Sequence, residues 1–191
     1  MKKTLQNLAA AFVGESQARN RYSYYSKIAK KEGYEVIAEV FALTAEQEKV
    51  HAKREFEHIQ KLKGKNEAVV LPEVEVPVTY GNTKENLKAA MAGEKYEYTE
   101  MYPEFAKVAR EEGFDDVAKR FASISLAEKH HEERFGKLLE HLEKGTMFKR
   151  SEKVWWICRE CGYVHFGAEA PKECPSCDHP QAYYQFKNED Y

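Results

Sequence analysis

The chain repeats one pattern of residues at an offset of eighty positions, and this repeat limits the possible folds more than any other feature. The matched positions are Glu32-Gly33-Tyr34 with Glu112-Gly113-Phe114, Phe41-Ala42 with Phe121-Ala122, Glu48 with Glu128, His51 with His131, and Arg54 with Arg134. Gly14-Glu15 finds its counterpart in Gly93-Glu94, one residue out of step. A shared helical pattern could produce some matches by chance, but it would not place a glutamate and a histidine at matching points. The repeat therefore predicts a duplicated helical hairpin.

Helix breakers are rare between residues 4 and 145, and they divide this segment into four helices of roughly thirty residues each. Gly33 and Gly113 mark two tight connections. A valine-rich and extended crossover of about twenty residues is expected between the second and third helices. Its breakers are Pro72, Pro77 and Gly81. A bundle with a single long crossover is the ferritin-like arrangement. Pro103 predicts a kink or an irregular turn in the third helix.

The composition changes near Arg150, after which helical periodicity ends and all four cysteines follow. We therefore predict a mainly α chain with two domains: a four-helix bundle over residues 1–147 and a small metal-binding β/loop domain over residues 153–191. The net charge of −2 gives no basic excess that would favour nucleic acid. No apolar stretch approaches 18 residues, so no membrane span is expected. Two Cys-x-x-Cys pairs confined to one end favour metal binding in a reducing cytoplasm over a disulfide framework.

Glutamates and histidines interrupt the apolar, core-facing stripes of all four predicted helices at about mid-length. They are Glu15 on the first helix, Glu48 and His51 on the second, Glu94 and Glu97 on the third, and Glu128 and His131 on the fourth. Residues three and four apart share a helix face, so both members of each Glu-x-x-His pair point inward. Mid-helix positions fall in one layer of the bundle, where buried unpaired carboxylates cost several kcal/mol each. Two cations would offset that cost, and this residue set is typical of di-iron or di-manganese bundles.

The alternative to a metal site is that these glutamates and histidines form ordinary pairs on the helix surface. A single Glu-x-x-His on a helix is usually a surface pair, but two such pairs in register with Glu15 and Glu94 are not expected at a surface. Glu97 has no carboxylate partner in the repeat, because Ala18 occupies the matching place. His58, His130 and His141 fall off the stripes and are expected to be exposed.

Cys158, Cys161, Cys174 and Cys177 form two Cys-x-x-Cys knuckles separated by twelve residues. Two such knuckles can surround one tetrahedral ion, and four thiolates suit zinc or iron. Spacing alone leaves a zinc ribbon open. Cys161-Gly162-Tyr163 and Cys174-Pro175 resemble the knuckles of rubredoxin, which favours iron. The shorter loop between the knuckles, and Asp178 where rubredoxins usually have glycine, depart from that pattern.

Both modules together resemble the rubrerythrin family over essentially the whole chain. The phrases that carry the resemblance are Gly14-Glu15-Ser16-Gln17-Ala18-Arg19-Asn20-Arg21-Tyr22, Glu48-x-x-His51, Gly93-Glu94-x-x-Glu97-Tyr98-Thr99-Glu100-Met101-Tyr102-Pro103 and Ala127-Glu128-x-x-His131-Glu132. The resemblance implies a non-haem di-iron peroxidase that reduces hydrogen peroxide to water in oxidative-stress defence.

The resemblance also implies the metal content and the residue roles. There would be three irons per chain: two held by the seven glutamates and histidines of the layer, and one held by the four cysteines. His51, Glu97 and Tyr102 would be the catalytic residues. In the family one iron moves between a histidine and a glutamate as its charge changes, and here those residues would be His51 and Glu97.

Electrons are expected to enter through the cysteine iron from an external donor, either a rubredoxin or an NAD(P)H-dependent reductase. A head-to-tail homodimer is expected, because roughly 20 Å of helix separates the di-iron layer from the cysteine module of the same chain. The main alternative is a ferritin-type ferroxidase that handles iron. A third hypothesis makes the cysteine module a zinc ribbon that recruits a partner.

Overall fold

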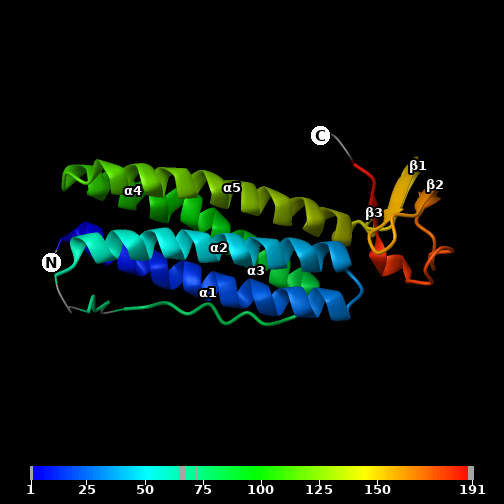
Figure 1. Ribbon diagram of the computed structural model, residues 1–191, viewed down its shortest axis with the longest axis horizontal. Helices are drawn as coiled ribbons and strands as arrows, with labels where there is room; N and C mark the ends of the chain where they lie inside the picture. The colour runs from blue at the N-terminus through cyan, green and yellow to red at the C-terminus, as the bar shows by residue number, and fades with distance from the viewer. Residues whose placement is uncertain (1, 65–67, 72, 189–191) are drawn as a thin grey trace.

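The structure is a computed structural model, and it describes residues 2–64, 68–71 and 73–188. Four long helices lie side by side in a bundle (Figure 1). They are α1 (Lys3–Lys31), α2 (Glu35–Leu62), a third helix built from α3 (Thr83–Tyr96), a π-helical turn (Glu97–Met101) and α4 (Tyr102–Glu111), and α5 (Asp115–Glu143). This arrangement confirms the predicted mainly α, ferritin-like bundle with one long crossover. The irregular turn expected near Pro103 is the π-helical turn directly before α4.

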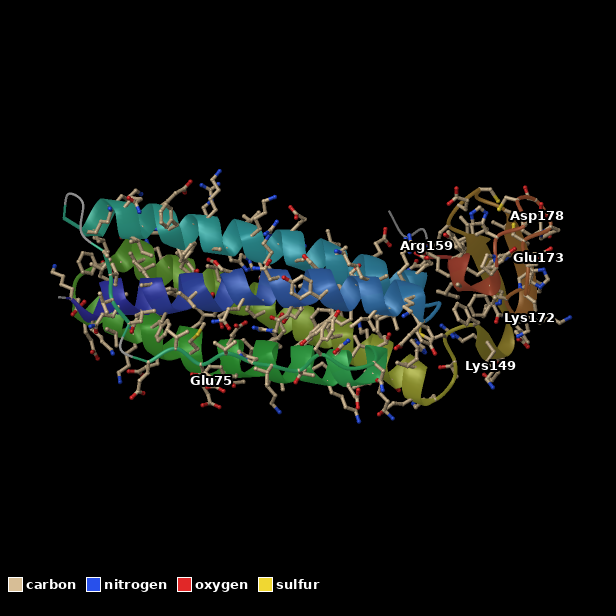
Figure 2. All side chains as sticks on the ribbon, turned by 90° about the horizontal axis from the view of Figure 1, so that it is seen from below. Glu75, Lys149, Arg159, Lys172, Glu173 and Asp178 are labelled. Atoms are coloured by element: carbon tan, nitrogen blue, oxygen red, sulfur yellow. The ribbon has the colours of Figure 1, made fainter. Side chains whose placement is uncertain are left out.

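The crossover between α2 and α3 runs along the bundle in extended form, without regular secondary structure in its described residues. Two side chains of α1 hold it: Gln17 donates a hydrogen bond to the carbonyl of Glu75 at 3.3 Å, and Tyr25 donates one to the carbonyl of Thr79 at 2.7 Å. Glu75 lies on this segment where it passes the bundle (Figure 2). Pro72, one of the predicted breakers, lies outside the described residues.

The repeated Glu-Gly pairs connect the two hairpins to each other. Glu112, after α4, accepts hydrogen bonds from the backbone N–H groups of Lys3 and Thr4 at the start of α1. Glu32, after α1, accepts one from the N–H of Thr83 at the start of α3. Each carboxylate therefore satisfies helix-starting N–H groups that have no partner within the helix. The repeat at these positions is explained by this reciprocal capping.

The glycines that follow these glutamates reverse the chain. Gly33 and Gly113 have φ angles of 82° and 80°, a left-handed conformation in which a side chain would be strained. Each glycine lets the next helix fold back along the one before it, which produces the tight connection expected from the sequence.

Two apolar clusters fill the bundle, one on each side of the middle layer. The first includes Leu8 and Phe121, and the second includes Phe41 and Phe135; all four side chains are fully buried. His58 is 8% exposed, so the prediction that it lies at the surface is wrong. It follows Glu55 by three residues on α2, and both lie on the inward side of the helix.

The C-terminal module is a small antiparallel sheet with the strand order β2-β1-β3. Its strands are β1 (Lys149–Cys158), β2 (Val164–Glu169) and β3 (Tyr184–Phe186), with a 3₁₀ turn at Gln181–Tyr183. Trp156, on the central strand β1, is fully buried and pairs with His165 on β2 and Phe186 on β3. The division into domains at residues 147 and 153 remains a prediction. In the structure, α5 ends at Glu143 and β1 begins at Lys149.

The module lies at the end of the bundle that carries the connection between α1 and α2 (Figure 1). Arg159 forms an ion pair with Glu39 of α2 at 2.7 Å, and Tyr34 stacks on Phe148 with ring centroids 6.5 Å apart. Arg159 is on the side of the module that faces the bundle, whereas Asp178 lies on the opposite side (Figure 2). Within the described ranges, no helix combines the length and the apolar character that crossing a bilayer requires.

Candidate metal centres

All four long helices contribute polar side chains to one buried layer of the bundle. Its fully buried members are Glu15 of α1, Glu48 of α2, Glu94 of α3, and Glu128 and His131 of α5. The side chain of His51, on α2, is 15% exposed. The Glu-x-x-His spacing places each pair on one helix face, as the sequence predicted. The structure thus brings together six of the seven glutamates and histidines predicted to bind metal.

These six side chains form two overlapping clusters, in each of which the possible ligand atoms lie within 4.8 Å of one another. One cluster consists of Glu15, Glu48, His51 and Glu128, and the other of Glu48, Glu94, Glu128 and His131. Each cluster has one histidine, one glutamate of its own and two glutamates that both clusters share. This is an arrangement for two adjacent cations.

The distances repeat across the two clusters. His51 Nδ1 lies 3.0 Å from Glu48 Oε2 and 2.9 Å from Glu128 Oε1. His131 Nδ1 lies 3.0 Å from Glu48 Oε1 and 2.7 Å from Glu128 Oε2. The two oxygens of each shared glutamate therefore face different histidines, which suits a carboxylate that contacts two ions.

The donor atoms of the layer fit cations better than they fit one another. Glu15 Oε2, Glu48 Oε1, Glu94 Oε2, both oxygens of Glu128 and His131 Nδ1 are buried without a partner in hydrogen-bonding geometry. Buried polar atoms are rarely left unpaired, because an unmet lone pair costs about 1–3 kcal/mol. Carboxylate oxygens and imidazole nitrogens together suit iron, manganese or zinc.

Without a cation, protons would have to balance the charge of the layer. Burial would lower the pKa of His51, but the carboxylates of Glu128 and Glu48, 2.9 and 3.0 Å from its Nδ1, outweigh it and raise that pKa to about 10. The same opposition raises the pKa of His131 to about 12. Burial and repulsion from Glu48 raise the pKa of Glu94 to about 8. In the absence of metal, protons bound to the histidines and to Glu94 would therefore balance the negative charge of the layer.

Two buried tyrosines support the carboxylates from the side. The Tyr22 hydroxyl donates a hydrogen bond to Glu94 Oε1 at 2.5 Å. The Tyr102 hydroxyl bonds to Glu15 and also lies 2.9 Å from Glu55 Oε1. Tyr102 was predicted as a site residue, but Tyr22 and Glu55 were not. Glu55 could have been found, because it follows Glu48 by seven residues on the same helix stripe.

Glu97, the seventh predicted ligand, belongs to neither cluster. It is the first residue of the π-helical turn, and its side chain is partly exposed. Seven positions separate Glu15 from Tyr22, whereas eight separate Glu94 from Tyr102. The wider π turn takes up this extra residue and restores the repeat from Tyr102 onward. The one-residue mismatch seen in the sequence is therefore explained by a local change of helix type.

A cavity of about 540 Å³ opens between α1, α3 and the crossover, and Glu97 is part of its wall. Gly14 and Gly93 line it on the helix side, Val74 lines it on the crossover side, and Arg21 supplies a cation. A Cβ atom at Gly14 would lie 4.0 Å from Glu97 Oε1. Glu97, whose side chain is partly exposed, therefore lies close to Gly14 of α1 in the wall of this cavity.

The four cysteine sulfurs of the C-terminal module lie within 4.8 Å of one another. Cys158 Sγ is 3.8 Å from Cys177 Sγ, and Cys161 Sγ is 3.7 Å from Cys174 Sγ. Four sulfurs bound about 2.3 Å from one ion lie about 3.8 Å apart in a tetrahedron. The separations fit one tetrahedral ion held by four thiolates.

The two knuckles have the same backbone reversal after their second cysteine. Gly162 has a φ angle of 77°, and Asp178 has a φ angle of 58°. Aspartate is one of the few residues besides glycine that visit this left-handed conformation, because its side chain can hydrogen-bond locally. The departure at Asp178 noted in the sequence is thus compatible with the usual knuckle geometry.

Comparisons with known proteins match both modules. Residues 6–139 match the family profile described as rubrerythrin, and residues 156–185 match the rubrerythrin, rubredoxin-like domain. A putative rubrerythrin of Methanocaldococcus jannaschii is 55% identical over 100% of this chain and 96% of its own length. The rubrerythrin of Nitratidesulfovibrio vulgaris is 46% identical over 96% and 93%. A structure of nigerythrin in a fully reduced, all-ferrous state aligns with a TM-score of 0.66 and 32% identity, covering 98% of this chain and 88% of that one.

Proposed function

Since the chain belongs to the rubrerythrin family, we propose that it reduces hydrogen peroxide to water as a non-haem di-iron peroxidase of oxidative-stress defence. The observation that carries this proposal is the combination, in one chain, of a buried layer with two overlapping ligand clusters and a separate four-thiolate site. The first suits a pair of ions that react together, and the second suits a single ion that passes electrons.

Glu15, Glu48, His51, Glu94, Glu128 and His131 would hold two irons, and Cys158, Cys161, Cys174 and Cys177 would hold the third. When bound, the irons of the layer supply the two electrons that peroxide takes up. Glu97 and His51 would exchange as ligands, since an anionic ligand suits a more highly charged ion and a neutral imidazole a less charged one.

The residues around the layer would bring in peroxide and keep bulk water out. The cavity beside Glu97 offers an entry path, and Arg21 gives its wall a positive charge. The Tyr102 hydroxyl, fully buried and bonded to Glu15, is placed to hold or deliver a proton beside the ligands.

Electrons would reach the layer from the cysteine site of a second copy of the chain. His131 lies twelve residues before the end of α5, so about 18 Å of helix separates the layer from the end of the bundle that carries the module. Asp178, next to Cys177, is on the side of the module turned away from its own bundle (Figure 2). A head-to-tail homodimer would place this side near the partner's layer. We further propose a cytoplasmic location and an external donor, either a rubredoxin or an NAD(P)H-dependent reductase.

The test combines metal analysis, a visible spectrum and peroxide turnover on anaerobically prepared protein. We expect three irons per chain, a red chromophore after oxidation, and peroxide consumption that depends on an added reductase. A colourless protein with zinc in the cysteine site would contradict the electron-transfer role. Oxidation of added Fe²⁺ without peroxide turnover would favour the ferroxidase alternative.

A further inference from the structure

A fifth buried carboxyl group lies beside the layer and belongs to neither ligand cluster. Glu55 is fully buried on α2, one turn after His51, and its Oε1 lies 2.9 Å from the Tyr102 hydroxyl. We propose that Glu55 is a neutral acid that donates its proton to Tyr102 and so commits the single Tyr102 hydroxyl proton to Glu15. Through Tyr102 it would supply one proton to peroxide reduction. This second part rests on the proposed function.

The number of protons at this contact supports the assignment. A tyrosine hydroxyl has one proton to donate, yet the Tyr102 oxygen lies within hydrogen-bonding distance of both Glu15 and Glu55. One carboxyl group must therefore donate to Tyr102. A metal-binding carboxylate is deprotonated, so Glu15 cannot hold the proton when it acts as a ligand. The proton then belongs to Glu55.

The surroundings of Glu55 also favour the neutral form. Its second oxygen, Oε2, is buried without a hydrogen-bond partner. An ionised group would place negative charge on this unpaired oxygen, whereas a neutral acid leaves only a carbonyl there. Burial raises the pKa of Glu55, and this effect outweighs the opposing influence of the Tyr102 contact and of the nearby His51.

The repeat supplies an internal comparison. Tyr22 and Tyr102 are eighty positions apart, and the position that matches Glu55 is Phe135. The Tyr22 hydroxyl bonds to Glu94, and its ring packs edge-on against Phe135 with centroids 5.4 Å apart. An apolar residue is thus sufficient to bury a tyrosine and keep it on a glutamate. The acid beside Tyr102 adds a proton that packing does not require.

The proton transfer balances with the proposed reaction, in which hydrogen peroxide, two electrons and two protons give two waters. As the O–O bond breaks, the Tyr102 hydroxyl gives its proton to the departing oxygen, while Glu15 stays a deprotonated ligand. The Glu55 O–H bond breaks and its proton restores the Tyr102 hydroxyl, which leaves Glu55 as a carboxylate. The electrons come from the irons of the proposed function, and water later returns the proton to Glu55. The second proton of the reaction comes from elsewhere.

Infrared spectroscopy tests where the proton is held. We expect iron-loaded protein to show a carboxylic-acid C=O band that is lost in Glu55→Gln and shifted in Tyr102→Phe, because the hydrogen bond to Tyr102 is removed. Glu57→Gln is the matched control, since Glu57 is an exposed glutamate on the same helix. An identical C=O region in the wild type and in Glu55→Gln would show that Glu55 is ionised and would overturn the proposal.

Stopped-flow peroxide consumption by the chemically reduced protein tests the relay. Positioned acids contribute about 10²- to 10⁴-fold, so we expect Glu55→Gln to slow O–O cleavage at least about tenfold with unchanged iron content. The double variant with Tyr102→Phe should be no slower than Tyr102→Phe alone. An unchanged rate in Glu55→Gln, with the infrared band assigned, would refute the relay while the neutral acid stands. Absence of peroxide consumption in the wild type would instead remove the proposed function, and the relay with it.

Discussion

Removing metal from the buried layer should make the stability of the protein fall steeply with rising pH. Between about pH 7.5 and 9, His51 and His131 keep their protons in the metal-free folded state, because their pKa values are about 10 and 12. The unfolded chain has histidines of ordinary pKa, near 6.5, which have lost their protons in this range. The folded state thus binds at least two more protons, because the raised pKa values of Glu94 and Glu55 add to those of the histidines, and its stability is lost as pH rises toward the folded pKa values.

The size of the effect follows from the number of protons. Each extra proton bound by the folded state changes the free energy of unfolding by about 1.4 kcal/mol per pH unit, so two give about 2.7 kcal/mol per unit. For a chain of this length, 1 kcal/mol moves Tm by about 2–4 °C. Metal-free protein should therefore lose at least about 5 °C of Tm for each pH unit above 7.5. Loaded protein should not, because metal binding requires deprotonated ligands and strengthens as pH rises.

Thermal unfolding followed by circular dichroism, under reducing conditions and with a chelator, measures this slope. Adjacent histidines provide the control: His131→Gln should lower the slope by about one proton, whereas His130→Gln should leave it unchanged. The pKa of the largely exposed His130 is lowered by partial desolvation and by Arg134, so this side chain is neutral above pH 7.5 in both the folded and the unfolded state. The cysteines are common to all three proteins, so their titration cancels. A flat Tm in the metal-free wild type, or equal slopes in both variants, would refute the reasoning.

Three further outcomes are expected. Cys161→Ser should abolish the red chromophore and steady-state turnover, while the chemically reduced layer still consumes peroxide once; normal turnover with a reductase would rule out electron entry through the cysteine site. Glu97→Ala should keep most of its iron in the reduced state but slow the oxidised half of the cycle, whereas Glu48→Ala and Glu128→Ala should lose iron; equal iron loss in all three would make Glu97 an ordinary ligand. Mixing Cys161→Ser with Glu128→Ala under subunit exchange should restore peroxidase activity, and inactive mixed dimers would show that electrons stay within one chain.

Periodicity and repetition were sufficient to predict the bundle and the six clustered side chains. Glu48 and Glu128 have matching positions in two helices, and their spacing to His51 and His131 fixes a shared helix face. The crossover was predictable because helical periodicity is missing there and its prolines and glycine exclude a continuous helix. Residue type, spacing and repetition together thus identified the layer.

Contacts between different helices were not predictable in the same way. The Tyr102 hydroxyl meets Glu55 only because the third helix faces α2 at that depth, and stripe positions do not specify such a pairing. The burial of His58 was missed because the buried face of a helix is wider than the single row of residues at heptad spacing. The π-helical turn was expected only as an irregularity near Pro103, because helix type depends on how the repeat realigns in three dimensions.

The extra carboxylate of the third helix, Glu97, bears on whether the two metals are electronically equivalent, because the matching position in the repeat is Ala18. A duplicated hairpin would by itself give both ions the same donors, and two equivalent ions share an electron hole equally. On the proposed ligand exchange, only the ion beside Glu15 and His51 can gain Glu97, so only that ion becomes easier to oxidise. The partly oxidised protein should then hold its Fe³⁺ at one position, visible as two distinct iron signals in its Mössbauer spectrum. Replacing Glu97 with alanine, the residue that the repeat has at Ala18, would restore the symmetry of the pair and remove the preference.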